Sequence, residues 1–402
     1  MALRVVGIAV GWGVALLWTT RASAWMRGIS RLPNLLELAP APARGSVSVI
    51  VPARNEGPGV AAGLRSLLAS KGVDIEVIAV DDRSTDDTGA TMDALQTDAL
   101  EQEARASRVR YAVEHVDELP AGWLGKPHAM ARGAALATGE WLLFTDADVV
   151  FAEDTLARAL SYVEREGGDH LLVVPTVVAQ SAGEAMMLPF LHVLSIWGPR
   201  LWRVADPHSR DAIGVGAFNL MRRSTYEAVG GWERLRMEVI EDVRIGYLIK
   251  GAGFASRVVT GYNLVRIRWA RGAWGVVTNL TKNVFAAFRF RIGLMVGGTV
   301  ATAIMCLLPF AGLVLGIGWD RAWLWPSLVS LTALAALYWR YRRFADPSGA
   351  PMLWLLAFPA AALVFIYAMV RSTVLTLMRG GVVWRGTFYP LRELRAHAGP
   401  FR

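Results

Sequence analysis

The stretch Trp141-Leu-Leu-Phe-Thr-Asp-Ala-Asp148 decides the fold of this chain. Its first four residues are apolar, which is typical of a short strand buried inside a sheet. Asp146 and Asp148 follow two positions apart, and in an extended chain such side chains point to the same side. Carboxylate oxygens suit a hard divalent cation, Mg²⁺ or Mn²⁺. An Asp-x-Asp pair standing alone is more often a pair of solvated loop carboxylates, so the flanking sequence must decide.

Strands and helices alternate before this stretch. Strands are expected at 47–51, 75–80 and 109–113. Helices are expected at about 58–70, from after Thr85 to about 106, and at 127–137. This alternation predicts an α/β domain with a mostly parallel sheet and helices on both faces. Ligands of such sheets bind beyond the carboxyl ends of the strands. Asp81 and Asp82 end one expected strand, and Asp146 and Asp148 follow another. Both acidic pairs are therefore expected at one edge of the sheet.

Composition indicates a protein that meets a membrane. The 402 residues are 54% hydrophobic and include 16 Trp, whose rings settle at membrane interfaces. The net charge of +8 comes from basic residues beside apolar stretches, which favours anionic lipid headgroups over nucleic acid as the partner. The single cysteine, Cys306, excludes an intrachain disulfide framework and a cysteine-based metal site.

The amino-terminal residues are expected to form a membrane helix. Residues 5–20 are apolar apart from two threonines, and arginines follow them, which predicts a retained helix over 1–21 with its basic flank in the cytoplasm. A signal peptide is the alternative, with Ala22-Ser-Ala24 as a weak cleavage signature. Prolines then indicate a linker over 22–45.

The last third of the chain predicts a transmembrane region over 292–378. Its apolar segments lie at about 293–318, 322–339 and 352–378, each near or above spanning length. The cluster Arg340-Tyr-Arg-Arg343 indicates a cytoplasmic loop, and the tail over 379–402 is also basic. Three spans after a cytoplasmic domain would place that tail outside, so these signals conflict. A re-entrant or interfacial segment would resolve the conflict.

The residues between the two regions are basic. Residues 263–291 contain six Lys or Arg and no Asp or Glu, interleaved with Trp and Phe. This composition predicts an amphipathic segment that lies on the cytoplasmic leaflet.

Five short motifs stand in order along the chain. They are Pro52-Ala-Arg-Asn-Glu56, Val80-Asp-Asp-Arg-Ser-Thr-Asp86, Gly122-Trp-Leu-Gly-Lys126, Thr145-Asp-Ala-Asp148, and Gly230-Gly-Trp232 followed by Glu241-Asp242. Together they resemble the motifs of glycosyltransferase family 2. Each is weak alone, but the ordered set is specific, and it covers roughly residues 45–290. The similarity extends to membrane-attached members that act on lipids, namely ceramide glucosyltransferases and bacterial enzymes associated with carotenoid or hopanoid synthesis.

This resemblance implies a GT-A fold over 46–262, a nucleotide-diphosphate sugar donor, a divalent metal and inversion at the anomeric carbon. It assigns the nucleotide to Asp82 and the metal to Asp148, with Asp146 supporting the metal or contacting ribose or sugar hydroxyls. The remaining donor contacts that it implies are Pro52, Arg54, Glu56 and Lys126. Helix capping is an ordinary role for acidic residues after a strand, and solvation is an ordinary role for a loop lysine.

The acidic pair Glu241-Asp242 has two interpretations. Acidic residues at a helix start are favourable in themselves, because they face the positive end of the helix dipole. The resemblance instead makes Asp242 the general base that takes a proton from the acceptor hydroxyl, with Glu241 beside it. An acceptor that arrives as a carboxylate would need no base.

One motif departs from the family pattern. The stretch Arg266-Ile-Arg-Trp-Ala-Arg271 is similar to the Gln/Arg-x-x-Arg-Trp motif of many relatives, but its spacing differs. Arg268 and Arg271 are the candidates for balancing the diphosphate charge as the nucleotide leaves.

The sequence therefore predicts a metal-dependent, inverting glycosyltransferase. Its acceptor would be a lipid or lipid-like molecule at the cytoplasmic face of a bacterial-type membrane that the chain crosses several times. A processive polysaccharide synthase is the first alternative, disfavoured by the imperfect Arg-Trp motif and the small number of spans. A non-catalytic membrane protein that binds sugar-nucleotide or lipid is the second, disfavoured by the intact acidic residues.

Overall fold

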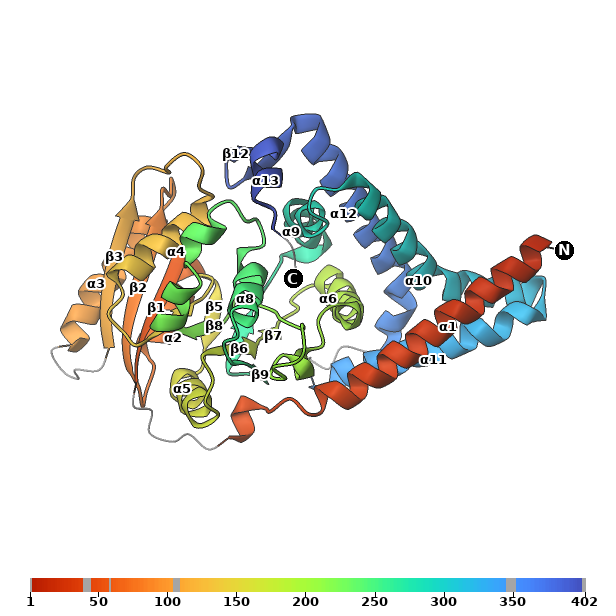
Figure 1. Ribbon diagram of the computed structural model, residues 1–402, viewed down its shortest axis with the longest axis horizontal. Coiled ribbons are helices and arrows are strands. Elements are labelled where there is room, and N and C mark those ends of the chain that lie inside the picture. Colours follow the sequence, from red (N-terminus) through yellow and green to blue (C-terminus); the bar gives the residue numbers. More distant parts are fainter. Residues whose placement is uncertain (1, 39–44, 58, 104–108, 345–351, 400–402) are drawn as a thin grey trace. The chain divides into compact units, whose positions relative to one another are not determined.

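The computed structural model describes residues 2–38, 45–57, 59–103, 109–344 and 352–399 (Figure 1). The chain packs into two compact units, each assembled from three separated segments. The sheet unit contains Leu32–Thr176, Leu201–Arg268 and Val383–Arg402, and the helical unit contains Met1–Arg31, Val177–Arg200 and Trp269–Val382. The boundary expected at 262/263 therefore lies at 268/269, and the tail joins the sheet unit.

A seven-stranded sheet of order β3-β2-β1-β4-β8-β6-β9 forms the centre of the sheet unit. The strands are β1 (Ser46–Ala53), β2 (Asp74–Asp82), β3 (Val109–Val116), β4 (Trp141–Phe144), β6 (His170–Val174), β8 (Asn219–Arg222) and β9 (Ser256–Thr260). Strands β1 to β4 are parallel, and β9 is parallel to β6, whereas β8 is antiparallel to both of its neighbours. The predicted mostly parallel α/β sheet is confirmed, with one reversed strand.

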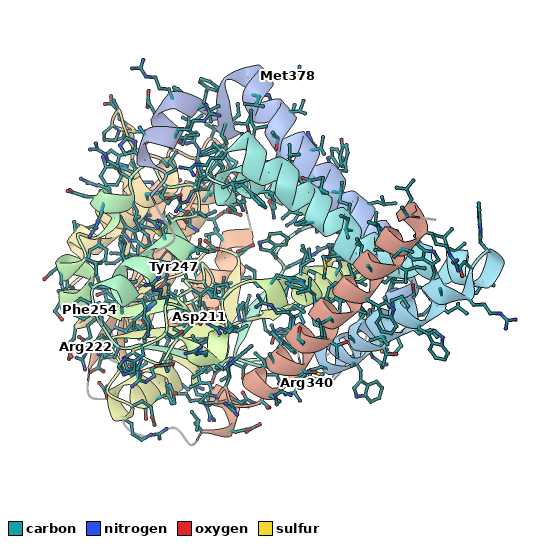
Figure 2. All side chains as sticks on the ribbon, turned by 45° about the vertical axis from the view of Figure 1, so that its right-hand side comes forward. Asp211, Arg222, Tyr247, Phe254, Arg340 and Met378 are labelled. Atoms are coloured by element: carbon teal, nitrogen blue, oxygen red, sulfur yellow. The ribbon has the colours of Figure 1, made fainter. Side chains whose placement is uncertain are left out.

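Helices bury this sheet, which explains why its strands are continuously apolar. They are α2 (Gly59–Leu68), α3 (Thr88–Glu103), α4 (Gly125–Leu136), α5 (Thr155–Arg165), α7 (Arg223–Ala228), α8 (Glu241–Gly251) and α13 (Leu391–His397). All four residues of β4 are buried, as expected for a central strand covered on both faces. Ile50 and Leu142 of the sheet share one core cluster with Ala129 of α4 and Ile245 of α8. Phe254, which follows α8, packs against the same cluster (Figure 2).

A smaller sheet has the order β5-β10-β7. Its strands are β5 (Val149–Phe151), β7 (Thr176–Val177) and β10 (Val265–Ile267). Because β10 pairs antiparallel with β5, the basic segment 263–291 is not one amphipathic helix. Its first residues are strand and loop, and helix α9 (Gly272–Ala287) begins only at Gly272.

The helical unit contains the apolar segments. Its helices are α1 (Ala2–Ile29), α6 (Ala182–Leu194), α9, α10 (Ile292–Gly318), α11 (Leu324–Phe344) and α12 (Phe358–Arg379). Among the described residues, four helical stretches are long and apolar enough to cross a membrane, at Ala2–Ile29, Ile292–Gly318, Arg321–Arg342 and Met352–Arg379. The expected linker is partly helical, since α1 continues to Ile29, and its prolines at 40 and 42 lie outside the described residues.

Helices α1 and α11 run in the same direction. Gly7 of α1 lies against Trp323, just before α11, and Gly11 lies against Pro326 one turn further along. A side chain on Gly7 would come within 2.8 Å of the Trp323 ring, so glycine allows the two helices to approach closely here.

Candidate active site

The acidic motifs lie where the sequence places them, at the carboxyl edge of the central strands. Strand β1 pairs with β2 on one side and with β4 on the other, so their carboxyl ends are neighbours. Asp81 and Asp82 end β2, and Asp146 and Asp148 follow β4. Residues far apart in sequence are therefore brought to one edge, which is where ligands of α/β sheets bind.

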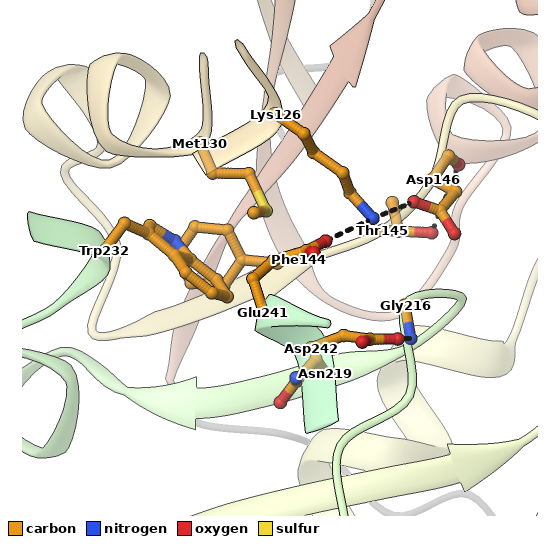
Figure 3. A pocket seen from close by; sticks show the side chains of 10 residues that line it. All are labelled: Lys126, Met130, Phe144, Thr145, Asp146, Gly216, Asn219, Trp232, Glu241 and Asp242. Carbon is orange, nitrogen blue, oxygen red and sulfur yellow. Dashed lines mark hydrogen bonds and ion pairs between the residues drawn. The ribbon is translucent and has the colours of Figure 1, made fainter. Parts of the chain in front are cut away.

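A cavity at this edge contains the catalytic candidates (Figure 3). Ten residues line it: Lys126, Met130, Phe144, Thr145, Asp146, Gly216, Asn219, Trp232, Glu241 and Asp242. The ammonium of Lys126 lies between two carboxylates, 2.6 Å from Oδ1 of Asp146 and 2.8 Å from Oε1 of Glu241 (Figure 3). The cavity thus combines apolar walls with a compact charged centre.

Lys126 compensates the acidic charge of the cavity. It lies in the first turn of α4, not in the loop that the sequence predicted. Burial lowers the pKa of its ammonium, but the carboxylates of Asp146, Glu241 and Asp242 outweigh burial and raise this pKa above its ordinary value. A charged lysine at the start of a helix opposes the helix dipole, so these carboxylates hold it there. Its predicted contact with the diphosphate stays a prediction.

Glu241 and Asp242 differ in their partners. Glu241 is only 3% exposed; burial raises its pKa to about 7, against the opposing effect of Lys126. Burial also raises the pKa of Asp242. The carboxylate of Asp242 accepts hydrogen bonds from the backbone N–H groups of Gly216, at 3.0 Å, and Val243, at 2.8 Å. Glu241 is therefore paired with the half-buried ammonium of Lys126, while Asp242 is oriented by the backbone at the cavity wall.

Gly216 allows two acidic side chains to lie close together. A Cβ at this position would lie 2.8 Å from Oδ2 of Asp146 and 3.2 Å from Oδ2 of Asp242. Its carbonyl accepts the backbone N–H of Asp146 at 3.0 Å, so the same residue binds both acids. The site residues inferred from sequence omit Gly216, although the Gly214-Val-Gly216 motif signals a close backbone approach.

We expect Gly216→Ala to lower turnover on the order of tenfold. The added methyl group must push Asp146 and Asp242 apart by a few tenths of an ångström, and catalysis is sensitive to displacements of that size. Gly251→Ala is the matched control, because nothing lies within 4 Å of its added Cβ. Initial rates at saturating substrates measure the effect, and equal rates for the two variants would contradict the role of Gly216.

The donor candidates form a second cluster, at the ends of β1 and β2. Arg83 binds Asp82 through two hydrogen bonds, Nε to Oδ1 at 2.8 Å and Nη2 to Oδ2 at 3.1 Å. Nη1 of Arg54 lies 3.8 Å from Oδ2 of Asp82. Pro52 pairs with Val80 in the sheet just before these loops. The structure therefore brings three of the predicted donor residues together and adds Arg83, which the sequence argument missed.

Hydrogen bonds join the β1 and β2 loops to each other. Oδ1 of Asn55 accepts the backbone N–H of Thr85 at 2.8 Å, and Oγ1 of Thr88 accepts the N–H of Glu56 at 2.9 Å. Asn55 has a φ of +53°, a left-handed conformation that asparagine tolerates better than most residues. The two loops thus form one rigid surface beside Asp82.

Asp148 lies near two other carboxylates, those of Asp146 and Glu56. Desolvation and the neighbouring carboxylates of Asp146 and Glu56 raise the pKa of Asp148 to about 6. A hard cation would compensate this charge. Within the described part of the chain, no three His, Cys, Asp or Glu side chains gather into a metal site of their own. A cation bound here would take its remaining oxygen ligands from water or from a bound diphosphate.

The two arginine candidates lie in different units. Arg268 is the last residue of its segment in the sheet unit, after β10. Arg271 precedes α9 as its N-cap residue, in the helical unit. The assignment of either side chain to the diphosphate stays a prediction.

Comparison with known proteins identifies the class. Residues 48–230 match the family model described as glycosyl transferase family 2. The chain is 25% identical over 363 residues to a 4,4'-diaponeurosporenoate glycosyltransferase of Staphylococcus aureus strain USA300, covering 87% of this chain and 89% of the relative. Its counterpart from the bovine strain RF122 / ET3-1 is 23% identical over 354 residues, with the same coverage of 87% and 89%.

A solved structure shares the fold. The mannosyltransferase PcManGT from Pyrobaculum calidifontis, in complex with GDP-Man and Mn²⁺, superposes with a TM-score of 0.52 at 21% identity, covering 93% of this chain and 98% of that one. The sheet, the acidic edge and these matches define a glycosyltransferase of the GT-A fold. Residues 48–230 are a glycosyl transferase family 2 domain, and the protein is an enzyme, not a binding scaffold.

Proposed function

We propose that this glycosyltransferase transfers a sugar from a nucleotide-diphosphate sugar to a carotenoid-type or similar lipid at the cytoplasmic face of a membrane. The observation that carries the proposal is the cavity in which Asp242 and Asp146 meet across Gly216. The four apolar helical stretches support a membrane acceptor. The diaponeurosporenoate named for the Staphylococcus aureus relatives supports the class of acceptor.

Asp242 is the general base in this proposal. It takes the proton of the acceptor hydroxyl while the acceptor oxygen bonds to the anomeric carbon. The bond from that carbon to the diphosphate breaks, and its electron pair leaves with the nucleoside diphosphate. Attack opposite the leaving group inverts the anomeric centre. Burial raises the pKa of Asp242, which makes its carboxylate a stronger base than a solvated one.

The other cavity residues hold the charges in place. Lys126 keeps Glu241 and Asp146 compensated, so that Asp242 is the acid left for proton transfer. Asp82, fixed by Arg83, presents the face that binds the nucleotide. Met130, Phe144 and Trp232 exclude water from the cavity.

A divalent cation, Mg²⁺ or Mn²⁺, fits the acidic oxygens at the end of β4. The carboxylates of Asp146 and Glu56 add to the burial that raises the pKa of Asp148, and carboxylates with diphosphate oxygens are the ligands that these ions prefer. Asp148 would hold the ion, with Asp146 beside it. When bound, the ion would supply positive charge to the diphosphate.

Mass spectrometry of lipid extracts tests the proposed function. We expect cells producing the protein to contain lipids heavier by one hexose, and cells producing Asp242→Asn to lack them. Purified enzyme with UDP- or GDP-hexose should reproduce the product. A ladder of hexose additions would indicate a processive synthase instead, and unchanged lipid profiles would contradict the proposal.

A further inference from the structure

We propose that the tail over 383–399 is part of the donor site, where Arg385 and Tyr389 act as positioning residues for the nucleotide-binding loops. This inference rests on the proposed function, because it assigns a role within donor binding. The tail follows the last apolar helix in sequence, yet it packs in the sheet unit. The motif resemblance, which covers roughly residues 45–290, therefore does not include this element.

The tip of a β-hairpin contacts the β1 loop. Strands β11 (Gly381–Trp384) and β12 (Thr387–Pro390) are joined by Arg385 and Gly386, with φ values of +47° and +80°. Both residues are left-handed, as in the two-residue turns that suit hairpins, and for arginine this conformation is costly. The Arg385 guanidinium donates to the carbonyl of Arg54 and forms an ion pair with Glu56. These contacts hold the turn against the loop.

Tyr389 connects the β2 loop to the start of α4. Its side chain is buried, with 6% exposed, and its hydroxyl accepts the backbone N–H of Gly125 at 3.2 Å. The hydroxyl also interacts with the guanidinium of Arg83, which binds Asp82. One hydroxyl group therefore touches both the loop that carries Asp82 and the helix turn that carries Lys126.

At Gly125, the start of α4 packs closely against the β2 loop. A Cβ at this position would lie 2.4 Å from Oδ2 of Asp82 and 2.9 Å from Nη2 of Arg83. A small movement of α4 away from the β2 loop would therefore change the surface that Asp82 presents. The hydrogen bond from Gly125 to Tyr389 opposes that movement.

The tail continues from the donor loops to the helix of the catalytic pair. Leu391 and Leu394 of α13 are buried and fix the tail on the sheet unit. Beyond α13, Gly399 lies against Arg244, and a Cβ there would come within 2.3 Å of its Nη2. Arg244 is on α8, two residues after Asp242. The segment thus connects the nucleotide end of the site with its catalytic end.

Titration calorimetry of the full-length purified protein with UDP and with GDP, each in Mn²⁺, tests the proposal. We expect Tyr389→Phe and Arg385→Ala to bind the preferred nucleotide about three- to tenfold more weakly, which is the effect of losing one hydrogen bond or a partly exposed ion pair. Arg385→Lys should recover part of the affinity because it keeps the charge. Turnover at saturating donor should stay near wild type, since neither residue touches the reacting atoms.

Arg392→Ala is the matched control. It removes the same charge from the same tail, but its side chain is exposed on α13, so its affinity should equal that of the wild type. Wild-type affinity in both Tyr389→Phe and Arg385→Ala would overturn the positioning role while leaving the proposed function intact. Failure of the wild type to bind either nucleotide would overturn the proposed function itself. If Tyr389→Phe does not fold, the Arg385 pair of variants decides.

Discussion

Asp242→Asn is expected to lower turnover on the order of 10²- to 10⁴-fold while the affinity for nucleotide-sugar stays close to that of the wild type. A base contributes mainly in the transition state, when the acceptor oxygen loses its proton. Asparagine keeps the size of the side chain and can still accept the backbone N–H of Gly216 or Val243, but it cannot take a proton. The donor loops and Lys126 are unchanged by the substitution.

Paired kinetics and calorimetry separate catalysis from binding at this position. Asp117→Asn serves as the control, because it changes the same kind of side chain at an exposed position of the sheet unit. Loss of donor affinity together with turnover, in a folded protein, would make Asp242 a donor-site or structural residue. Near-normal turnover would indicate that Glu241 is the base or that the acceptor arrives as a carboxylate, as the name of the Staphylococcus aureus relatives suggests for theirs.

Removal of the divalent cation should abolish transfer, and Mg²⁺ or Mn²⁺ should restore it. A bound cation contributes several kcal/mol of charge stabilisation, so Asp148→Ala should lower the rate on the order of 10²-fold or more. Without the cation, burial and the like charges of Asp146 and Glu56 disfavour the charged form of Asp148 more than Lys126 favours it, so removal of the carboxylate should not destabilise the fold.

The metal assignment predicts a specific pattern in donor binding. In the presence of Mn²⁺, Asp148→Ala should bind the nucleotide more weakly than the wild type, and in EDTA the two proteins should bind it equally weakly. Asp117→Ala should behave as the wild type under both conditions. Full activity in chelator, or a difference between the proteins that persists in EDTA, would show that Asp148 acts without a cation.

Local pattern was sufficient for the first four strands of the central sheet, the apolar helices and the position of the acidic motifs. Strands of the central sheet are buried on both faces, so their sequence is continuously apolar, and the parallel arrangement that follows from strand–helix alternation brings their carboxyl ends together. Asp82, Asp146 and Asp148 could therefore be placed at one edge before any contact was known. The motif order added the chemistry, because it assigned a role to each acid.

The tertiary structure decided the partners, which no local pattern contains. Lys126 was expected in a loop, but the attraction of Asp146 and Glu241 keeps its ammonium charged in spite of burial, and so makes it the compensating charge of the cavity. Strand β8 runs antiparallel to β4 and β6, and local pattern could not predict this because both partners are distant from it in sequence. The sequence shows that the tail is basic, but it shows neither the hairpin nor the residues that the hairpin contacts. Only the folded chain brings Tyr389 to Gly125, because a hydrogen bond between residues so far apart depends on the packing of everything between them.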